Sequence, residues 1–388
     1  MADVATFPGF RRAVGPPGIR NTVLVLSITG LTNPAARRIA AQVRGTHVIA
    51  MPYSTGLINE DREVHLRALE GLACNPNVGA VLIISDNVPK AKSLGAGIDA
   101  RGQRVEMALL DHEGQDAISL VAMGTRLAAK LVREVSGQLR EDMPLSALNI
   151  GLKCGRSDPS SGLMANPATG HFIDGHVDAG GTAIFGEVVE WLGAEELLAA
   201  RACDPAIAAQ LRNLPAEREV AAIAAGLDLT GNNPSPTNIA AGLSSIEEKS
   251  LGGISKTGTG QIKGVLDYAK APGEPGLFAM DTPNYAPEHL TALAAAGCQM
   301  ALFTTGAGNS FVSGLIPTLK VCANRSSCDK LKEQFDVTLD DLLDQNRPAT
   351  EGGTRIAKAV LDTAAGRLTW GEILGEGDDI VSRFGAAL

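Results

Sequence analysis

The stretch that decides the fold is LNIGLKCGRSDPSSGLMANPATGHFIDGHVDAGGTAIFGEVVEWLGAE, from Leu148 to Glu195. It begins with a short apolar strand that opens into a loop rich in glycine and hydroxyl side chains. A second apolar strand, Thr182–Phe185, leads directly to Glu187 and Glu190. Because neighbouring parallel strands deliver their carboxyl ends to one edge of a sheet, this pattern predicts an α/β protein with a small-molecule site at that edge.

The chain before this stretch alternates apolar strands with amphipathic helices. Four continuous apolar runs are typical of strands buried on both faces, namely Thr22–Ile28, His47–Pro52, Ala80–Ser85 and Val105–Leu110. Helical patterns lie at Asn33–Arg44, Glu60–Leu72, about Lys90–Arg101 and about Asp116–Ser136, the first with Asn33 as its expected cap. Right-handed crossovers between these strands predict a parallel sheet with helices on both faces.

A polar segment, Ser136–Ser146, is predicted to link two domains. Residues 1–140 then form an N-terminal α/β domain, and residues 141–388 form a larger α/β domain of the catalytic type. In the second domain the pattern predicts helices at Ala206–Leu211, Pro215–Gly226 and 287–296, a helix capped by Ser245, and strands at Gly276–Pro283, Cys298–Asn309 and, as the last strand, Pro317–Cys322.

Charge and cysteine content narrow the class of protein. A net charge of −9 argues against nucleic acid or an anionic membrane as the main partner. The six cysteines include no CxxC pair, which favours a reducing, cytoplasmic setting. The first residues lack a signal-peptide core and no run of 18 apolar residues occurs. We therefore expect a cytoplasmic protein that is a homo-oligomer, since its helical faces are rich in alanine.

Five segments in the same order carry a family resemblance: GLKCGRSDPSSGLMANPATG, GGTAIFGEVVEWLGAEELL, GNNPSPTNIAAGLSSIEEKSLG, DTPNYAPEHLTALAAAGCQMALFTTGAGN and PTLKV. Together they resemble the altronate/galactarate dehydratase family, which includes the large subunit of sulfolactate sulfo-lyase. The resemblance runs from about Gly18 to Lys320. It implies elimination of water or sulfite from the β-position of a hydroxy acid, so that the substrate is a small anionic carboxylate. The small N-terminal domain of some members has no counterpart here, which is similar to the arrangement in which a separate small subunit supplies it.

The chain departs from the family at the positions of its strand-end cysteines. Those positions read Gly30-Leu31, Tyr53-Ser54-Thr55 and Asn87-Val88-Pro89, and a further cysteine that follows SLG in the family is Gly253 here. Thiolates at three converging strand ends suit iron, whereas these side chains cannot replace thiolates. We therefore expect no cysteine-bound iron centre, and the cofactor is left undetermined. A divalent metal on oxygen ligands is the alternative, although helix caps and turns explain Asn33 and Asp86 as well.

The resemblance and the strand-end positions together select four catalytic candidates. Glu187 is the candidate base, Lys153 a clamp for the substrate carboxylate, and Asp158 and Cys154 polar groups beside the substrate. A glycine-rich turn in which Asp158 bonds to the backbone is the structural alternative. Glu187 and Glu190 are expected on one helical face, where they could also be ordinary first-turn carboxylates.

A second set of residues is predicted to bind substrate: Ser157, Asn166, Glu190, Asn238, Lys249, Thr304, Thr305, Gly306 and Lys320. Thr304, Thr305 and Gly306 end a strand and could hold an anion with hydroxyls and backbone N–H groups. Lys249 follows two glutamates and could instead belong to a charged surface. A buried Lys320 would need a carboxylate partner, or it could bind the substrate carboxylate.

Three functions are compatible with these observations. The first is a hydro-lyase that converts a sugar-acid-like carboxylate into a 2-keto acid. The second is a carbon–sulfur lyase of the sulfolactate type. The third is a member of the family that binds a small acid without catalysis, because the loss of the cysteines removed the metal. Nucleotide binding is not expected, since the glycine-containing segments are too short for a dinucleotide motif.

Overall fold

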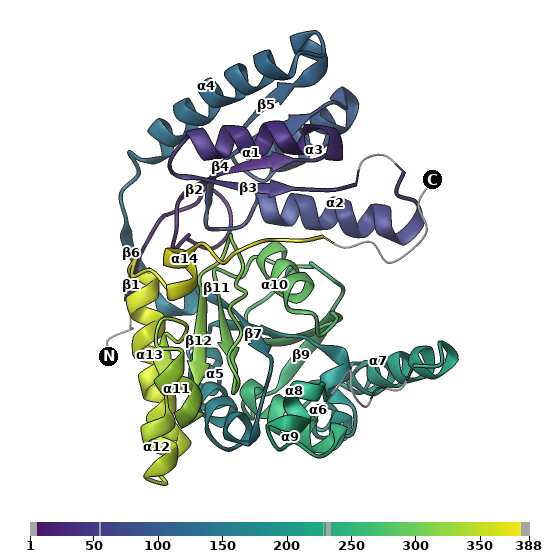
Figure 1. Ribbon diagram of the computed structural model, residues 1–388, viewed down its shortest axis with the longest axis vertical. Coiled ribbons are helices and arrows are strands. Elements are labelled where there is room, and N and C mark those ends of the chain that lie inside the picture. Colours follow the sequence, from purple (N-terminus) through teal and green to yellow (C-terminus); the bar gives the residue numbers. More distant parts are fainter. Residues whose placement is uncertain (1–5, 54–55, 228, 230–233, 382–388) are drawn as a thin grey trace.

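The computed structural model describes residues 6–381 except 54–55, 228 and 230–233. Within these residues the strands form a four-stranded parallel sheet, a seven-stranded parallel sheet and a two-stranded antiparallel pair. The smaller parallel sheet belongs to the upper body in Figure 1 and the larger one to the lower body. The predicted α/β class with parallel sheets is confirmed. No helix in the described part of the chain is long and apolar enough to cross a membrane.

The strands have the following bounds: β1 Thr6–Gly9, β2 Thr22–Ser27, β3 Thr46–Ala50, β4 Val78–Ser85, β5 Val105–Leu109, β6 Glu141–Pro144, β7 Asn149–Cys154, β8 Thr182–Phe185, β9 Ile262–Leu266, β10 Leu277–Met280, β11 Met300–Thr304, β12 Thr318–Cys322 and β13 Val337–Thr338. The order in the small sheet is β3-β2-β4-β5, and in the large sheet β13-β12-β11-β7-β8-β10-β9.

The α-helices are α1 Asn33–Gln42, α2 Asn59–Ala73, α3 Val88–Ala100, α4 Ala117–Val135, α5 Asn166–Asp178, α6 Glu195–Ala199, α7 Pro205–Ala224, α8 Pro236–Ala240, α9 Ile246–Ile254, α10 Ala286–Ala295, α11 Arg325–Lys330, α12 Asp340–Asp344, α13 Ala349–Ala364 and α14 Trp370–Leu374. A π-helical turn, Ser161–Ala165, leads into α5, and short 3-10 helices cover Val188–Trp191 and Ser255–Thr257.

The small sheet is covered on both faces. Apolar residues of α1 and α4 pack on one face, and those of α2 and α3 pack on the other. Strand residues alternate between the two cores, so that Val23 and Val25 face α1 and α4, whereas Leu24 and Leu26 face α2 and α3. This two-sided burial explains why the strands are continuously apolar in sequence.

Helix α2 joins the two bodies, because it packs on the small sheet and also on α10 of the large one (Figure 1). A Cβ added at Gly71 would overlap the carbonyl oxygen of Ala295, so this contact requires glycine. The Asn75 side-chain amide then donates to the carbonyl oxygens of Ala294 and Cys298, at 2.7 and 2.9 Å. One apolar core, containing residues of both sheets, lies around this junction.

Several element predictions need correction. The expected linker contains a short strand that was not predicted, β6, which pairs with β1. One helix, α7, spans both predicted helices with Pro215 inside it. The strand β9 was not predicted, and β13 follows the strand expected to be last. Asn33 does not cap α1, because its side-chain amide donates to the Met51 carbonyl oxygen instead.

The junction at α2 can be tested by adding one methyl group. We expect Gly71→Ala to lower the free energy of unfolding by about 1–3 kcal/mol, because the added Cβ forces α2 and α10 apart. Gly175→Ala in α5 is the matched control. No atom lies within 4 Å of an added Cβ there, so the helix should gain up to about 1 kcal/mol. Equal effects of the two substitutions in urea unfolding would contradict the close contact.

Candidate active site

The site lies at the carboxyl ends of β7, β8 and β11 in the large sheet. The chain places β8 on one side of β7 and β11 on the other, so the strand order reverses direction at β7. Open parallel sheets leave a crevice outside the strand ends at such a reversal, and ligands bind there. The loops that follow these three strands contain most of the residues that the sequence selected.

A cavity of about 410 Å³ opens at this edge. It is lined by the loop after β7, the π-helical turn before α5, and α9 with the residues before it. The lining residues are Ser157, Asp158, Pro159, Ser161, Gly162, Leu163, Asn166, Leu243, Glu248, Lys249, Leu251, Gly252 and Gly253. The backbones of the two helical segments approach closely at Gly162 and Gly252, since a Cβ at Gly252 would lie 3.2 Å from the Gly162 Cα. π-helical turns are rare and often occur at functional sites.

Glu187 is the centre of a buried charged cluster behind the cavity. Its side chain is fully buried and forms ion pairs with the ammonium groups of Lys153 and Lys256, the second at 3.3 Å. The backbone N–H of Cys154 also donates to Glu187 Oε2 at 3.0 Å. Glu187 has a positive φ of 70°, a conformation that costs free energy in a residue with a Cβ and that clusters at functional sites.

Lys153 and Lys256 share this one carboxylate. Lys153 Nζ also donates to the carbonyl oxygens of Cys154 and Asn284, at 2.7 and 2.9 Å, and Lys256 Nζ donates to the Gly253 carbonyl oxygen at 3.2 Å. Burial alone would lower the pKa of Lys256, but the Glu187 carboxylate outweighs burial and raises it. Two ammonium groups around one carboxylate leave a surplus positive charge next to the Gly253 carbonyl, in the cavity wall.

A chain of hydrogen bonds fixes the backbone of Glu187. Its N–H donates to Thr282 Oγ1 at 3.0 Å, and Thr282 Oγ1 is 2.7 Å from His289 Nδ1. His289 Nε2 lies 2.9 Å from the Leu152 carbonyl oxygen, so it carries the proton and donates. Burial, with a further contribution from the charge of Lys153, lowers the pKa of His289 to about 3. The imidazole is therefore neutral at pH 7.

A second ion pair joins Lys249 to Glu190 Oε1 at 2.9 Å, and both side chains are buried. Burial alone would lower the pKa of Lys249, but the Glu190 carboxylate raises it overall. The other oxygen, Glu190 Oε2, is buried and has no hydrogen-bond partner among the described residues. It lies 3.9 Å from the position that a Cβ would take on Gly253, and Gly253 and Lys249 both line the cavity. The unpartnered oxygen is thus directed at the cavity wall.

Cys154 lies between the charged cluster and the cavity. Its Sγ is 2.7 Å from Ser157 Oγ and 3.8 Å from Asn166 Nδ2. Asn166 is held by Thr304, whose hydroxyl donates to Asn166 Oδ1 at 2.6 Å, and it donates to the Gly252 carbonyl oxygen at 2.8 Å. Asn166 thereby connects the end of β11 to α9 across the cavity floor.

Asp158 lies in the cavity lining as a carboxylate with many donors. Oδ1 accepts from Ser160 Oγ at 2.6 Å and from the Ser161 N–H at 3.1 Å, and Oδ2 accepts from Asn324 Nδ2 at 2.5 Å. A Cβ on Gly306 would overlap this carboxyl group. Position 306 therefore requires glycine, because any side chain there would collide with the Asp158 carboxyl group.

The remaining predicted binding residues lie around the cavity rather than in it. Asn238 Nδ2 donates to the Ser157 carbonyl oxygen at 2.8 Å and so holds the loop after β7. The N–H groups of Thr305 and Gly306 already donate to the carbonyl oxygens of Val321 and Arg156, and Thr305 Oγ1 accepts from the Gly308 N–H. These two N–H groups therefore already have acceptors and are not free to bind an anion, contrary to the expectation from the sequence.

The Lys320 ammonium group is buried and forms no ion pair with a carboxylate among the described residues, against the expectation that it would need one. It is aligned with Phe303 and Lys153 in the register of β12, β11 and β7. Its Nζ lies 3.9 Å from the Phe303 ring centroid and donates to the carbonyl oxygens of Asn309 and Phe311. Burial lowers the pKa of Lys320 to about 7. The cation is thus satisfied by an aromatic face and two carbonyl groups.

The structure gathers most predicted site residues at one sheet edge, but two local expectations were wrong. Glu187 and Glu190 do not share a helical face, because Glu187 has left-handed backbone geometry and precedes the 3-10 helix Val188–Trp191. Lys249 is not part of a charged surface, because it is 7% exposed and paired with Glu190.

Sequence reasoning missed Lys256, His289 and Asn324. Lys256 lies in the 3-10 helix that follows α9 and not on one helix with Lys249. The roles of all three depend on contacts with Glu187, Thr282 and Asp158, which are distant in sequence, so no local pattern indicated them.

The positions at which the family carries cysteines do not fit a cysteine-held metal in this chain. Gly30 and Asn87 follow β2 and β4 of the small sheet, and of the described positions only Gly253, in α9, lines the cavity described here. Among the described residues, no group of three or more histidine, cysteine, aspartate or glutamate side chains could hold a metal ion. Cys154 contributes a single thiol, and Gly253 contributes no ligand atom from a side chain. We therefore derive the chemistry of the site from its lysines and carboxylates.

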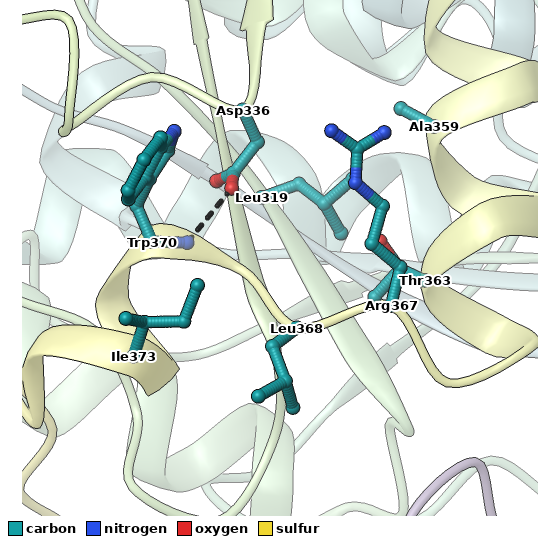
Figure 2. A pocket seen from close by; sticks show the side chains of 8 residues that line it. All are labelled: Leu319, Asp336, Ala359, Thr363, Arg367, Leu368, Trp370 and Ile373. Carbon is teal, nitrogen blue, oxygen red and sulfur yellow. Dashed lines mark hydrogen bonds between the residues drawn. The ribbon is translucent and has the colours of Figure 1, made fainter.

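Another cavity, of about 350 Å³, lies between β12, α13 and α14 (Figure 2). Its half-buried carboxylate, Asp336, already accepts from the backbone N–H groups of Trp370 and Lys320, at 3.0 and 2.8 Å. Figure 2 shows the Trp370 N–H directed at this carboxylate. Asp336 therefore anchors α14 to the sheet, and we assign no ligand to this cavity.

The neutral state of His289 makes stability depend on pH. An unfolded histidine takes up a proton below about pH 6.5, whereas folded His289 does not do so until about pH 3. The contribution of neutral His289 to the free energy of unfolding is therefore fully present above about pH 6.5 and is lost as the pH falls below that value. From this group we expect a loss of about 2 kcal/mol between pH 7.5 and pH 5. His289→Gln should reduce the pH dependence of urea unfolding by that amount, and an unchanged slope would contradict a buried neutral imidazole.

Comparison with known proteins places the chain in a family. Residues 9–136 match the model of the D-galactarate dehydratase/altronate hydrolase second domain, and residues 145–387 match that of the D-galactarate/altronate dehydratase C-terminal domain.

Three relatives illustrate the range of the family. The (2R)-sulfolactate sulfo-lyase subunit beta of Chromohalobacter salexigens is 36% identical over 381 residues, which are 97% of both chains. The altronate dehydratase of Bacillus subtilis is 35% identical over 82% of this chain and 66% of its own length. The galactarate dehydratase (L-threo-forming) of Escherichia coli is 29% identical over 78% of this chain and 60% of its own length. The chain belongs to the D-galactarate/altronate dehydratase family of lyases.

Proposed function

We propose that this protein is a lyase that eliminates the β-substituent of a small hydroxylated carboxylate. In the favoured form of the reaction, water leaves a sugar-acid-like substrate and a 2-keto acid is formed. The relatives named as dehydratases support this class of reaction. The single observation that carries the proposal is the buried, unpartnered Glu190 Oε2 beside Lys249 at the cavity wall.

The roles follow from which polar groups are already satisfied. Lys249 lines the cavity, so its ammonium group binds the substrate carboxylate. Glu190 Oε2 has no donor, so it is the better base for the proton next to that carboxylate. Glu187 was the base favoured by sequence, but two ammonium groups and a backbone N–H occupy its oxygens. Its role in the proposal is to position Lys153 and Lys256.

In this elimination every proton and electron pair is accounted for by the substrate and the residues named above. Glu190 takes the proton from the carbon next to the carboxylate, and an enediolate forms. The surplus positive charge of Lys153 and Lys256 stabilises that enediolate from behind the cavity wall. A carbon–carbon double bond forms as the carbon–oxygen bond breaks, and the departing hydroxide takes up the proton to leave as water. The resulting enol rearranges to the 2-keto acid.

A second candidate is the elimination of sulfite from a 3-sulfonated 2-hydroxy acid. The observation that favours it is the match over 97% of both chains to a sulfolactate sulfo-lyase subunit. The same base and clamp would serve, with a carbon–sulfur bond breaking instead. Because that relative is named as a subunit, we propose that a second chain associates with this one, while every residue assigned to the elimination lies on this chain. A homo-oligomer remains a prediction from the alanine-rich helical faces. No cysteine-bound iron enters either form of the proposal.

An assay of products separates the two forms. The purified protein is incubated with altronate, galactarate and (2R)-sulfolactate, and 2-keto acid and sulfite are measured separately. Keto acid without sulfite from a sugar acid supports the hydro-lyase, and sulfite in equal amount from sulfolactate supports the carbon–sulfur lyase. Binding of these acids without any product would leave only the non-catalytic alternative and contradict the proposal.

The two glutamates can be distinguished by matched substitutions. We expect Glu190→Gln to lower kcat by at least about 100-fold, because the base is lost, and to destabilise the protein less than Glu187→Gln, because one buried ammonium group rather than two loses its carboxylate. Glu187→Gln should instead destabilise the protein by about 3–5 kcal/mol, because two buried ammonium groups lose their shared carboxylate. Exposed Glu196→Gln is the control for both. Normal turnover by Glu190→Gln would remove Glu190 from the mechanism.

Gly253 offers a test that does not remove a charge. A Cβ at this position meets no atom closer than Glu190 Oε2 at 3.9 Å, so alanine fits in α9 and should stabilise the helix by up to about 1 kcal/mol. The same methyl group is added to a residue that lines the cavity, and it lies 3.9 Å from Glu190 Oε2. We therefore expect kcat/KM to fall about tenfold or more in a protein that unfolds no earlier than the parent. Unchanged kcat/KM would show that substrate does not approach through this part of the wall.

A further inference from the structure

The small sheet has a reversal point of its own. In the order β3-β2-β4-β5 the chain moves from β2 to β3 on one side and then to β4 on the other, so the crevice lies between the ends of β2 and β4. Lys90 bridges these ends, because it is on α3 after β4 and its Nζ donates to the Ile28 carbonyl oxygen after β2, at 3.0 Å. The general rule for open parallel sheets therefore places a ligand here as well.

A cavity of about 420 Å³ opens beside this point, between α2 and α3. It is lined by Leu57, Arg62, His65, Leu66, Leu69, Asn87, Lys90, Ser93 and Leu94. It shares no lining residue with the candidate active site. Figure 1 shows α2 and α3 in the upper body, whereas β7, β11 and α9 are in the lower one. The two cavities are separate.

The charged lining has one sign. Arg62 and Lys90 contribute two positive charges from opposite helices, and among the described residues neither aspartate nor glutamate lines the cavity. Burial lowers the pKa of Lys90, and the charge of Asp86 only partly opposes this. An anion bound between the two helices would stabilise the protonated form of Lys90.

The rest of the lining is apolar with a few hydrogen-bonding groups. Leu66, Leu69 and Leu94 form an apolar side, and Leu66 is 37% exposed. Asn87 and Ser93 add polar atoms near Lys90, and Asn87 Oδ1 already caps α3 by accepting from the Lys90 N–H. A pocket with polar groups at one end and apolar side chains at the other selects a ligand that is polar at one end and apolar at the other.

We propose that the cavity between α2 and α3 is a second ligand site, which binds a short-chain carboxylate with its anionic end at Arg62 and Lys90 and its apolar end against Leu66, Leu69 and Leu94. This site shares no lining residue with the cavity beside Glu190. A cavity of about 420 Å³ is large enough to hold such a molecule.

The experiment measures binding of butyrate and acetate to the full-length protein by isothermal titration calorimetry. Butyrate should bind several-fold more tightly than acetate, because its alkyl end reaches the leucines. Lys90→Met and Arg62→Met should each weaken butyrate binding by about tenfold or more. Lys92→Met, on the exposed side of α3, is the matched control and should leave binding unchanged.

Two further variants test the apolar end of the site and its separation from the other cavity. Leu66→Ser should remove the preference for butyrate over acetate without weakening acetate binding. Lys249→Met, in the other cavity, should leave butyrate affinity unchanged. No saturable butyrate binding, equal affinity for acetate and butyrate in the parent protein, or loss of binding in Lys249→Met but not in Lys90→Met would each overturn the proposal.

Discussion

The candidate site depends on one interaction, the buried carboxylate of Glu187 shared by the ammonium groups of Lys153 and Lys256. Taking three charges out of water is costly, so such a cluster persists only where hydrogen bonds satisfy each group. Here carbonyl oxygens, the Cys154 N–H and the chain through Thr282 and His289 supply them. The cluster therefore ties the ends of β7 and β8 to α9 and sets the potential of the neighbouring cavity.

The three carboxylates of the site differ in whether their oxygens are already occupied by hydrogen-bond donors. Glu187 is fully engaged, whereas Glu190 keeps one buried oxygen without a partner among the described residues. Asp158 faces the cavity with both oxygens occupied by donors, which makes it a weaker candidate for taking a proton. The difference between these three carboxylates lies in their donors and not in their burial, because all three are buried.

Much of the fold could be read from the sequence, because burial on both faces leaves continuous apolar runs at β2, β4, β7 and β11. The gathering of Cys154, Asp158 and Glu187 at one edge followed from parallel strands. The sequence did not indicate which residues interact when they are distant from one another along the chain. Pairing of Glu187 with Lys256 depends on the 3-10 helix after α9 lying close to the residues after β8. The choice between Glu187 and Glu190 depends on hydrogen bonds that no local pattern encodes. The pairing of β1 with β6 was missed for the same reason.

The central claim is that the cavity beside Lys249 and Glu190 is the place where a hydroxy acid reacts. A crystal structure of the Glu190→Gln variant with a bound sugar acid or sulfolactate tests it most directly. Our account expects the ligand carboxylate within hydrogen-bonding distance of Lys249 Nζ, with the adjacent carbon facing residue 190 near Gly253. A ligand bound elsewhere, with this cavity filled only by solvent, would contradict the account.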